Sequence, residues 1–253
     1  MNLNCKKAIK TIIKANKVIN PANPFYNKKV YDAVYDSIHY DSNTSKWVWT
    51  HQTRLNGSIS NGNVIIVVLE SPHVDEFNSN GNGTYPLIND SSFRSHFIQG
   101  LCNSKNLPNL NKQNTYYIYL MNAIRYQCSL GLPTGYFRDF VFLYFWERLK
   151  KDFSTRILTM AKQNTIFAII NLCTKGNHKH TTQLITRSGQ ISMYKSCCKS
   201  FFKNLGISNY QNLTNYSLQS IVDLEIMNII KNNKIFHTIG THPSSWIQKS
   251  TIL

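Results

Sequence analysis

Two short polar stretches near opposite ends of the chain carry the residue types most capable of chemistry. Residues 69–73 read Leu-Glu-Ser-Pro-His, and residues 241–246 read Thr-His-Pro-Ser-Ser-Trp. Each stretch directly follows a short apolar run rich in β-branched residues, at 64–69 and 235–239, which predicts a buried strand ending in a polar turn. In an open parallel sheet, ligands bind in the crevice at the carboxyl ends of the strands. The two stretches are therefore expected to face each other across one candidate pocket.

The rest of the chain supplies the elements that would position these turns. Apolar runs at 115–121 and 165–172 predict two more strands, ending at Asn122 and Asn171. Patterns at helical spacing predict helices over residues 6–18, 28–39, 93–102, 136–151 (continuing after a break over 157–162), 192–205 and 218–231. A short extra strand is expected over 46–51 and a flexible loop over 78–83.

Strands that alternate with helices predict right-handed parallel crossovers, and hence an α/β fold. The expectation is a three-layer sandwich around a central four-stranded parallel sheet. At 253 residues the chain is long enough for one good-sized core. Residues 1–253 are therefore treated as a single domain, with residues 1–60 as an N-terminal helical extension.

Charge is the second informative property of the chain. It holds 28 Lys and Arg residues against 12 Asp and Glu residues, a formal net charge of +16. This imbalance favours a polyanionic partner, with nucleic acid first, over a merely basic soluble protein. DNA is accordingly the expected partner, bound by a monomer.

The cysteines predict neither a metal site nor a disulfide framework. None of the six forms a CxxC pair, and their spacings match no zinc or iron–sulfur pattern. Reduced thiols suit a reducing cytoplasm. No signal peptide and no apolar run of transmembrane length is found, so a cytoplasmic protein without membrane, metal or cofactor is expected.

The order of the polar strand ends resembles the uracil-DNA glycosylase superfamily. That family carries a GQDPYH-like or GEAPG-like turn after its first strand, an LLLN-A-like end of the next strand and HPSPL after the last. Residues 120–123 (Leu-Met-Asn-Ala) are similar to the second motif, and His242, Pro243 and Ser244 are identical to the start of the third. The resemblance spans residues 64–246 and implies a uracil-DNA-glycosylase-like sandwich.

The resemblance implies a role for each matching position. Asn122 matches the asparagine that hydrogen-bonds the Watson–Crick edge of a flipped base, which suits an amide because it offers a donor and an acceptor. His242 matches the histidine that donates to the base carbonyl O2 as negative charge develops there. The alternatives are an ordinary turn at Asn122 and a helix start at His242.

Other matching positions are expected to contact substrate or DNA. The group comprises Ser71, Pro72, His73, Tyr85, Asn171, Ser244 and Trp246. Ser71, Pro72 and Ser244 match phosphate-contacting loops. Tyr85 is chosen as the ring that stacks on the base, over Phe93. Trp246 matches the leucine that wedges into the duplex, with packing beneath the loop as the alternative.

The chain departs from the better-known branch of the family at two positions. Ser71 stands where that branch has its catalytic aspartate, so Glu70 is chosen as general base over Asp75 and Glu76. The alternative for Glu70 is a buried carboxylate that caps backbone amides, and Asp75 and Glu76 are expected in a solvated first helical turn. His73 replaces the tyrosine that bars a substituent at pyrimidine C5, which favours a larger base than uracil.

The resulting hypothesis is a monofunctional DNA glycosylase that excises a modified pyrimidine, such as glucosylated hydroxymethylcytosine in phage DNA, as an antiviral defence. Its alternatives are a uracil-excision repair glycosylase and a catalytically inactive DNA-binding module on the same fold. A nuclease ranks last because the acids are not clustered as a two-metal site requires.

Overall fold

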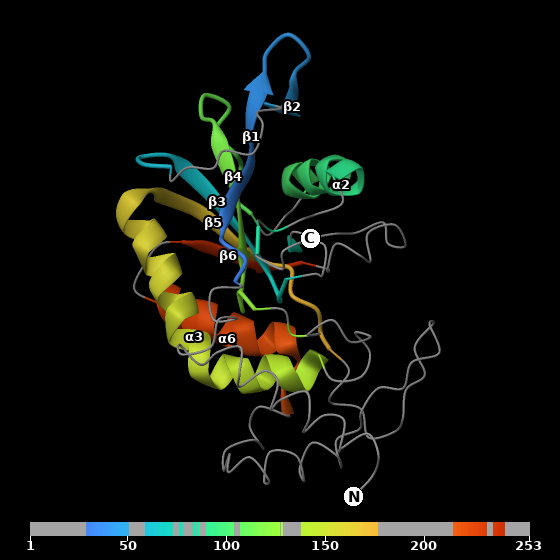
Figure 1. Ribbon diagram of the computed structural model, residues 1–253. Helices are drawn as coiled ribbons and strands as arrows, with labels where there is room; N and C mark the ends of the chain where they lie inside the picture. The colour runs from blue at the N-terminus through green and yellow to red at the C-terminus, as the bar shows by residue number, and fades with distance from the viewer. Residues whose placement is uncertain are drawn as a thin grey trace, which may run out of the picture.

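A computed structural model describes residues 29–50, 59–72, 76–77, 83–84, 86, 90–103, 107–126, 128, 138–176, 215–231 and 235–240. These residues form a six-stranded mixed sheet with helices on both of its faces (Figure 1). The predicted α/β class is confirmed. The helices expected over 6–18 and 192–205 lie outside the described residues.

The sheet contains the four expected strands, the short extra strand expected over 46–51 and one strand that was not expected. Its members are β1 (Ala33–Asp41), β2 (Lys46–Trp49), β3 (Asn63–Leu69), β4 (Tyr116–Asn122), β5 (Thr165–Asn171) and β6 (Phe236–Ile239). Their order is β2-β1-β4-β3-β5-β6. The pairs β4–β3, β3–β5 and β5–β6 are parallel, whereas β1 is antiparallel to both β2 and β4.

Strand β1 corrects the predicted helix over residues 28–39. Its pairing with β4 shifts register between Val34 and Asp36, so Tyr35 is an extra residue, as in a β-bulge. The bulge lets Tyr35 and Ile38, three residues apart, pack into the same apolar cluster. A three-residue spacing of buried side chains is the signature of a helix, which explains why the pattern misled.

Two helices cover one face of the sheet, and a third covers the other. Helices α3 (Arg138–Gln163) and α6 (Leu218–Ile230) share an apolar cluster with one face, and α2 (Asp90–Asn103) packs on the opposite face (Figure 1). Helix α3 is continuous, where a break was predicted. Phe153, Ile157 and Met160 keep a buried stripe running through that point, and no Pro or Gly interrupts it.

Strand β3 is buried on both faces, as its unbroken apolar run predicted. Side chains alternate across the sheet. Val64, Ile66 and Val68 therefore pack toward α3 and α6, and Ile65, Val67 and Leu69 pack toward α2. This alternation decides which way the polar residues at the strand ends point.

No helix in the described part of the chain has the length and apolar character needed to cross a membrane.

Candidate functional site at the carboxyl edge of the sheet

The carboxyl ends of the parallel strands line up along one edge, as the sequence predicted. Asn122 at the end of β4 pairs with Leu69, the residue before Glu70. Asn171 at the end of β5 pairs with Val68. Strand β6 ends at the same edge and leads toward the histidine-containing turn, which lies outside the described residues.

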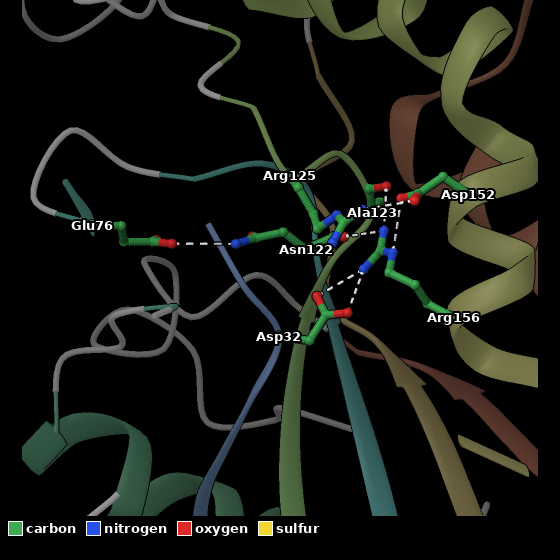
Figure 2. A network of polar contacts seen from close by, with 7 residues as sticks. All are labelled: Asp32, Glu76, Asn122, Ala123, Arg125, Asp152 and Arg156. Atoms are coloured by element: carbon green, nitrogen blue, oxygen red, sulfur yellow. Dashed lines mark hydrogen bonds and ion pairs between the residues drawn. The ribbon is translucent and has the colours of Figure 1, made fainter. Parts of the chain in front are cut away.

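Asn122 is buried at this edge and faces a carboxylate. It is 1% exposed, and its Nδ2 donates a hydrogen bond of 3.2 Å to Glu76 Oε2. Figure 2 shows the amide pointing toward Glu76 and away from helix α3. Because a carboxylate oxygen accepts hydrogen bonds, the amide nitrogen faces Glu76 and the amide oxygen faces elsewhere.

The amide oxygen of Asn122 has no hydrogen-bond partner among the described residues, although it is buried. A buried acceptor left unpaired costs about 1–3 kcal/mol, so nearly all such groups in folded proteins are satisfied. An exception of this kind at the ligand-binding edge of an α/β sheet marks Asn122 Oδ1 as a position for a ligand donor.

Glu76 is 3% exposed, which corrects its expected place in a solvated helical turn. Its backbone carbonyl accepts hydrogen bonds from the amide and the hydroxyl of Thr84, at 2.8 and 2.9 Å. The Thr84 carbonyl in turn accepts from Tyr31 N at 3.1 Å. A side chain on Gly83 would lie 2.3 Å from the carbonyl oxygen of Lys29, so glycine is required for this close approach. The segment before β1 therefore helps to hold Glu76, although the family resemblance begins only at residue 64.

Arg156, in the C-terminal half of α3, holds the chain just after β4. Its Nη2 donates to the carbonyl oxygens of Asn122 and Ala123 at 2.9 and 3.2 Å (Figure 2). Its Nη1 lies 2.7 and 2.8 Å from the two carboxylate oxygens of Asp32, and its Nε donates to Asp152 at 3.0 Å. Arg156 thus fixes the backbone that presents the Asn122 amide.

Asp32 is the carboxylate that Arg156 neutralises. Burial raises the pKa of Asp32, and the charge of Arg156 opposes that rise. The raised pKa means that burial disfavours the ionised form of Asp32, and the charge of Arg156 offsets part of that cost.

Glu70 points to the other face of the sheet from Asn122. It continues the alternation that sends Val64, Ile66 and Val68 toward α3. The Glu70 Oε1 atom lies 3.1 Å from Arg138 Nε, at the start of that helix. This ion pair lacks hydrogen-bond alignment, so Oε1 has no hydrogen-bond partner in the described part. The structure therefore brings Glu70 and Asn122 to one edge without direct contact between them.

The other oxygen of Glu70 is held by the chain after β5. Thr174 Oγ1 donates to Glu70 Oε2 at 2.5 Å. Thr174 is itself placed by helix α6, because Gln219 N donates to its carbonyl oxygen at 3.0 Å. Gly176 has a positive φ of 70°, and a side chain there would lie 2.8 Å from Asp139, so this turn also requires glycine.

Burial raises the pKa of Glu70, while the neighbouring Arg138 opposes that rise. Asp139 raises it further, and hydrogen bonds from Thr174 and Ser71 lower it. The Glu70 charge in turn raises the pKa of Arg138, which stays a cation. A carboxylate with a raised pKa, beside a fixed cation, is suited to accept a proton from water.

Asn171 has a structural role in place of the predicted contact with substrate. Its Nδ2 donates to the carbonyl oxygen of Gln219 and to Asp223, and its Oδ1 accepts from Cys173 N. The Gln219 side chain returns hydrogen bonds to the carbonyl oxygens of Asn171 and Gly240, at 3.3 and 2.7 Å. This exchange ties β5, α6 and β6 together and fixes the direction in which the chain leaves β6.

The remaining predicted residues divide into two groups. Ser71 is half-buried and Pro72 is buried, both directly after β3. Outside the described residues lie His73, Asp75, Tyr85, His242, Ser244 and Trp246.

Sequence reasoning missed the residues that hold the site: Asp32, Arg138, Arg156 and Gln219. One signal was available, because Arg156 lies among the buried α3 residues Phe153, Ile157 and Met160. A cation beside a buried apolar stripe indicates a buried carboxylate partner, because a buried charge is costly unless it is paired.

Known proteins offer no match to this chain, whether as family models, curated sequences or solved structures. In the described part, no group of three or more His, Cys, Asp or Glu residues is placed to hold a metal ion.

Proposed function

We propose that the chain is a monofunctional DNA glycosylase that hydrolyses the N-glycosidic bond of a flipped, modified pyrimidine. The observation that carries the proposal is the buried, unpartnered Asn122 Oδ1, held by Glu76 on one side and by Arg156 through the backbone. A flipped base is recognised through hydrogen bonds to its Watson–Crick edge, which a fixed amide can supply.

The strand order supports a uracil-DNA-glycosylase-like sandwich as part of this proposal. Strand β3 lies between β4 and β5, so the two crossovers from β3 to β4 and from β4 to β5 run on opposite faces of the sheet. Such a reversal opens a crevice at the carboxyl ends of the strands. The hydrogen bond between Glu70 and Thr174 lies at this reversal, between β3 and β5.

The proposal gives the polar residues separate tasks. Asn122 recognises the base edge, and Glu70 orients and deprotonates the attacking water, with Ser71 hydrogen-bonded to its carboxylate. His242 donates to the carbonyl O2 of the leaving base, a role that rests on the family resemblance. The modified base, glucosylated hydroxymethylcytosine as the leading candidate, and the role in defence against phage are part of the same proposal.

A silent DNA-binding module is the second candidate, because Glu70 is already engaged by Arg138 and Thr174. The deciding experiment treats duplexes that contain single modified bases with the protein and then with alkali, which cleaves at abasic sites. Strand scission on at least one modified duplex supports the glycosylase, and no scission on any of them supports the module.

Binding to duplex DNA is expected to weaken steeply with salt. The net charge of +16 favours phosphate contacts, each of which releases counterions. With about six such contacts, affinity should fall by about 1,000-fold between about 50 and about 200 mM salt. Fluorescence anisotropy with a labelled duplex gives the slope. A nearly flat dependence would show that the charge does not act on DNA.

Base release should be lost as the pH falls through the raised pKa of Glu70, because only the ionised carboxylate accepts a proton from water. The hydrogen bond from Thr174 lowers that pKa, so Thr174→Val should move the acid limb of the rate to higher pH. Single-turnover rates across the acid range measure both effects. An acid limb that Thr174→Val leaves in place would assign the titration to another group.

A further inference from the structure

We infer that Arg138 and Asp139 are positioning residues for Glu70: together they accompany its charge and leave its Oε1 atom open to the attacking water. The inference rests on the proposed function, because it assigns the atom with which Glu70 acts as general base. Both residues lie at the start of α3, and both act through Glu70 without touching the substrate.

The argument begins with the single N–H of Arg138 Nε. This atom lies 3.1 Å from Glu70 Oε1, yet its hydrogen is donated to Asp139 Oδ1 at 3.3 Å. The N–H groups of a planar guanidinium have fixed directions, so the one at Nε cannot serve both acceptors well. Asp139 therefore draws this donor away from Glu70. This explains why an ion pair at such a short distance leaves Oε1 without a hydrogen-bond partner in the described residues.

The Nη2 atom of Arg138 sets the direction of the Thr174 hydroxyl. It donates to Thr174 Oγ1 at 3.2 Å and to Asp139 Oδ1 at 3.3 Å. Because arginine can only donate, Thr174 Oγ1 is the acceptor in this contact, and its own hydrogen is directed to Glu70 Oε2. Oε2 is therefore occupied, and Oε1 is the oxygen that remains for a ligand.

A buried carboxylate oxygen of this kind is suited to bind water. Glu70 is 4% exposed, and buried acceptors are normally paired with a protein group or an ordered water. In the proposed reaction, the water held at Oε1 attacks the sugar C1′. Its proton passes to Oε1 as the C–O bond forms, and the electron pair of the broken C1′–N bond leaves with the base. A hydrogen bond from Arg138 to Oε1 would compete with that water.

The same two residues set the charge around Glu70. Burial raises the pKa of Glu70, the Arg138 charge opposes that rise, and the Asp139 charge adds to it. The other titratable neighbours in the described part are the thiols of Cys128, after β4, and Cys173, after β5. Burial raises the pKa of both thiols, so they are neutral across the acid range in which Glu70 titrates.

The first test follows the ionisation of Glu70 itself. The infrared band of its protonated carboxyl, isolated as the difference between the wild-type chain and Glu70→Gln, gives the midpoint pH. Arg138→Met removes the accompanying cation, so the midpoint should rise by at least about one pH unit, as expected for the loss of one nearby opposite charge. Arg138→Lys keeps a cation and should restore most of that shift. A midpoint that Arg138→Met leaves in place would overturn the inference.

The second test separates position from charge, and it stands even if Arg138→Met does not fold. Asp139→Ala and Asp139→Asn remove the same negative charge, but only Asp139→Asn keeps an oxygen that accepts from Arg138 Nε. In Asp139→Ala the freed N–H can turn to Glu70 Oε1, 3.1 Å away. The single-turnover rate of base release, on its pH plateau, should be at least about tenfold lower in Asp139→Ala than in Asp139→Asn. Equal plateau rates would overturn the inference.

Glu147→Gln is the matched control for the loss of a carboxylate on α3. Glu147 contacts only Lys150 among the ion pairs of the described part, at 3.7 Å, so this variant should leave the midpoint and the rate unchanged. The two tests also separate the inference from the proposed function. A midpoint that shifts as expected, in a protein that releases no base from any duplex, would support the pairing of Arg138 with Glu70 and overturn the glycosylase. Base release, with a midpoint that Arg138→Met does not move, would support the glycosylase and overturn the inference.

Discussion

Glu70→Gln is expected to lower the single-turnover rate of base release by at least about 100-fold, the usual contribution of a general base. The variant removes the proton acceptor but keeps the shape of the side chain, and Thr174 can still donate to the new amide oxygen. DNA affinity should not change, because the residue is 4% exposed and makes no phosphate contact in this account.

The fold should tolerate this change because Arg138 keeps a second carboxylate. Its Nη2 lies 3.3 Å from Asp139 Oδ1, and its side chain is 27% exposed, so water can solvate it. Glu147→Gln serves as the control and should retain the wild-type rate. Wild-type release by Glu70→Gln would move the proton acceptor to Asp75 or Glu76, or leave the water unassisted.

Arg156→Met is expected to give the largest loss of stability, about 3–5 kcal/mol, because it leaves a buried carboxylate without its partner. The Asp32 side chain is 9% exposed, and Arg156 is the cation in contact with both of its oxygens. The variant also removes the donors to the carbonyl oxygens of Asn122 and Ala123. Urea unfolding followed by circular dichroism measures the loss.

The deficit of Arg156→Met should grow as the pH rises. The raised pKa of Asp32 means that ionisation of this carboxyl opposes folding. The contribution of Asp32 to stability is therefore most favourable below the unfolded pKa of about 3.9, and it is lost as the pH rises through the pKa of the folded state. Removing Arg156 takes away the charge that lowers the pKa of Asp32, so the loss of stability with rising pH becomes larger. Arg148→Met on the exposed surface of α3 is the control and should lose less than about 1 kcal/mol. A deficit that does not depend on pH would show that Asp32 is not the destabilising group.

Much of the fold could be predicted from local sequence, because buried parallel strands produce unbroken apolar runs. Strands β3, β4, β5 and β6 were predicted within a residue or two of their bounds. Strand β1 was predicted as a helix because its bulge places Tyr35 and Ile38 on one face, and a bulge depends on pairing with β4. Pairing between distant segments leaves no local pattern.

The candidate site was predicted in outline and differs in its partners. The chain order of Glu70, Asn122 and Asn171 was enough to place all three at one edge. The contacts between particular carboxylates and amides depend on the direction of each side chain and on how the loops pack. Glu76 reaches Asn122 because residues 29–31 and 83–84 pack together, and Asn171 turns to α6 because its position in β5 faces that helix. Neither contact follows from residue type or spacing.

The central claim, hydrolysis of an N-glycosidic bond, is tested most directly by mass spectrometry of the bases that the protein releases from DNA. The substrates are genomic DNAs that contain cytosine, hydroxymethylcytosine or glucosylated hydroxymethylcytosine, each incubated with the wild-type chain and with Glu70→Gln. The account predicts that the wild-type chain releases a free modified base, with an equal number of abasic sites, and that Glu70→Gln releases almost none. No free base from any of the three DNAs, under conditions where the protein binds them, would contradict it.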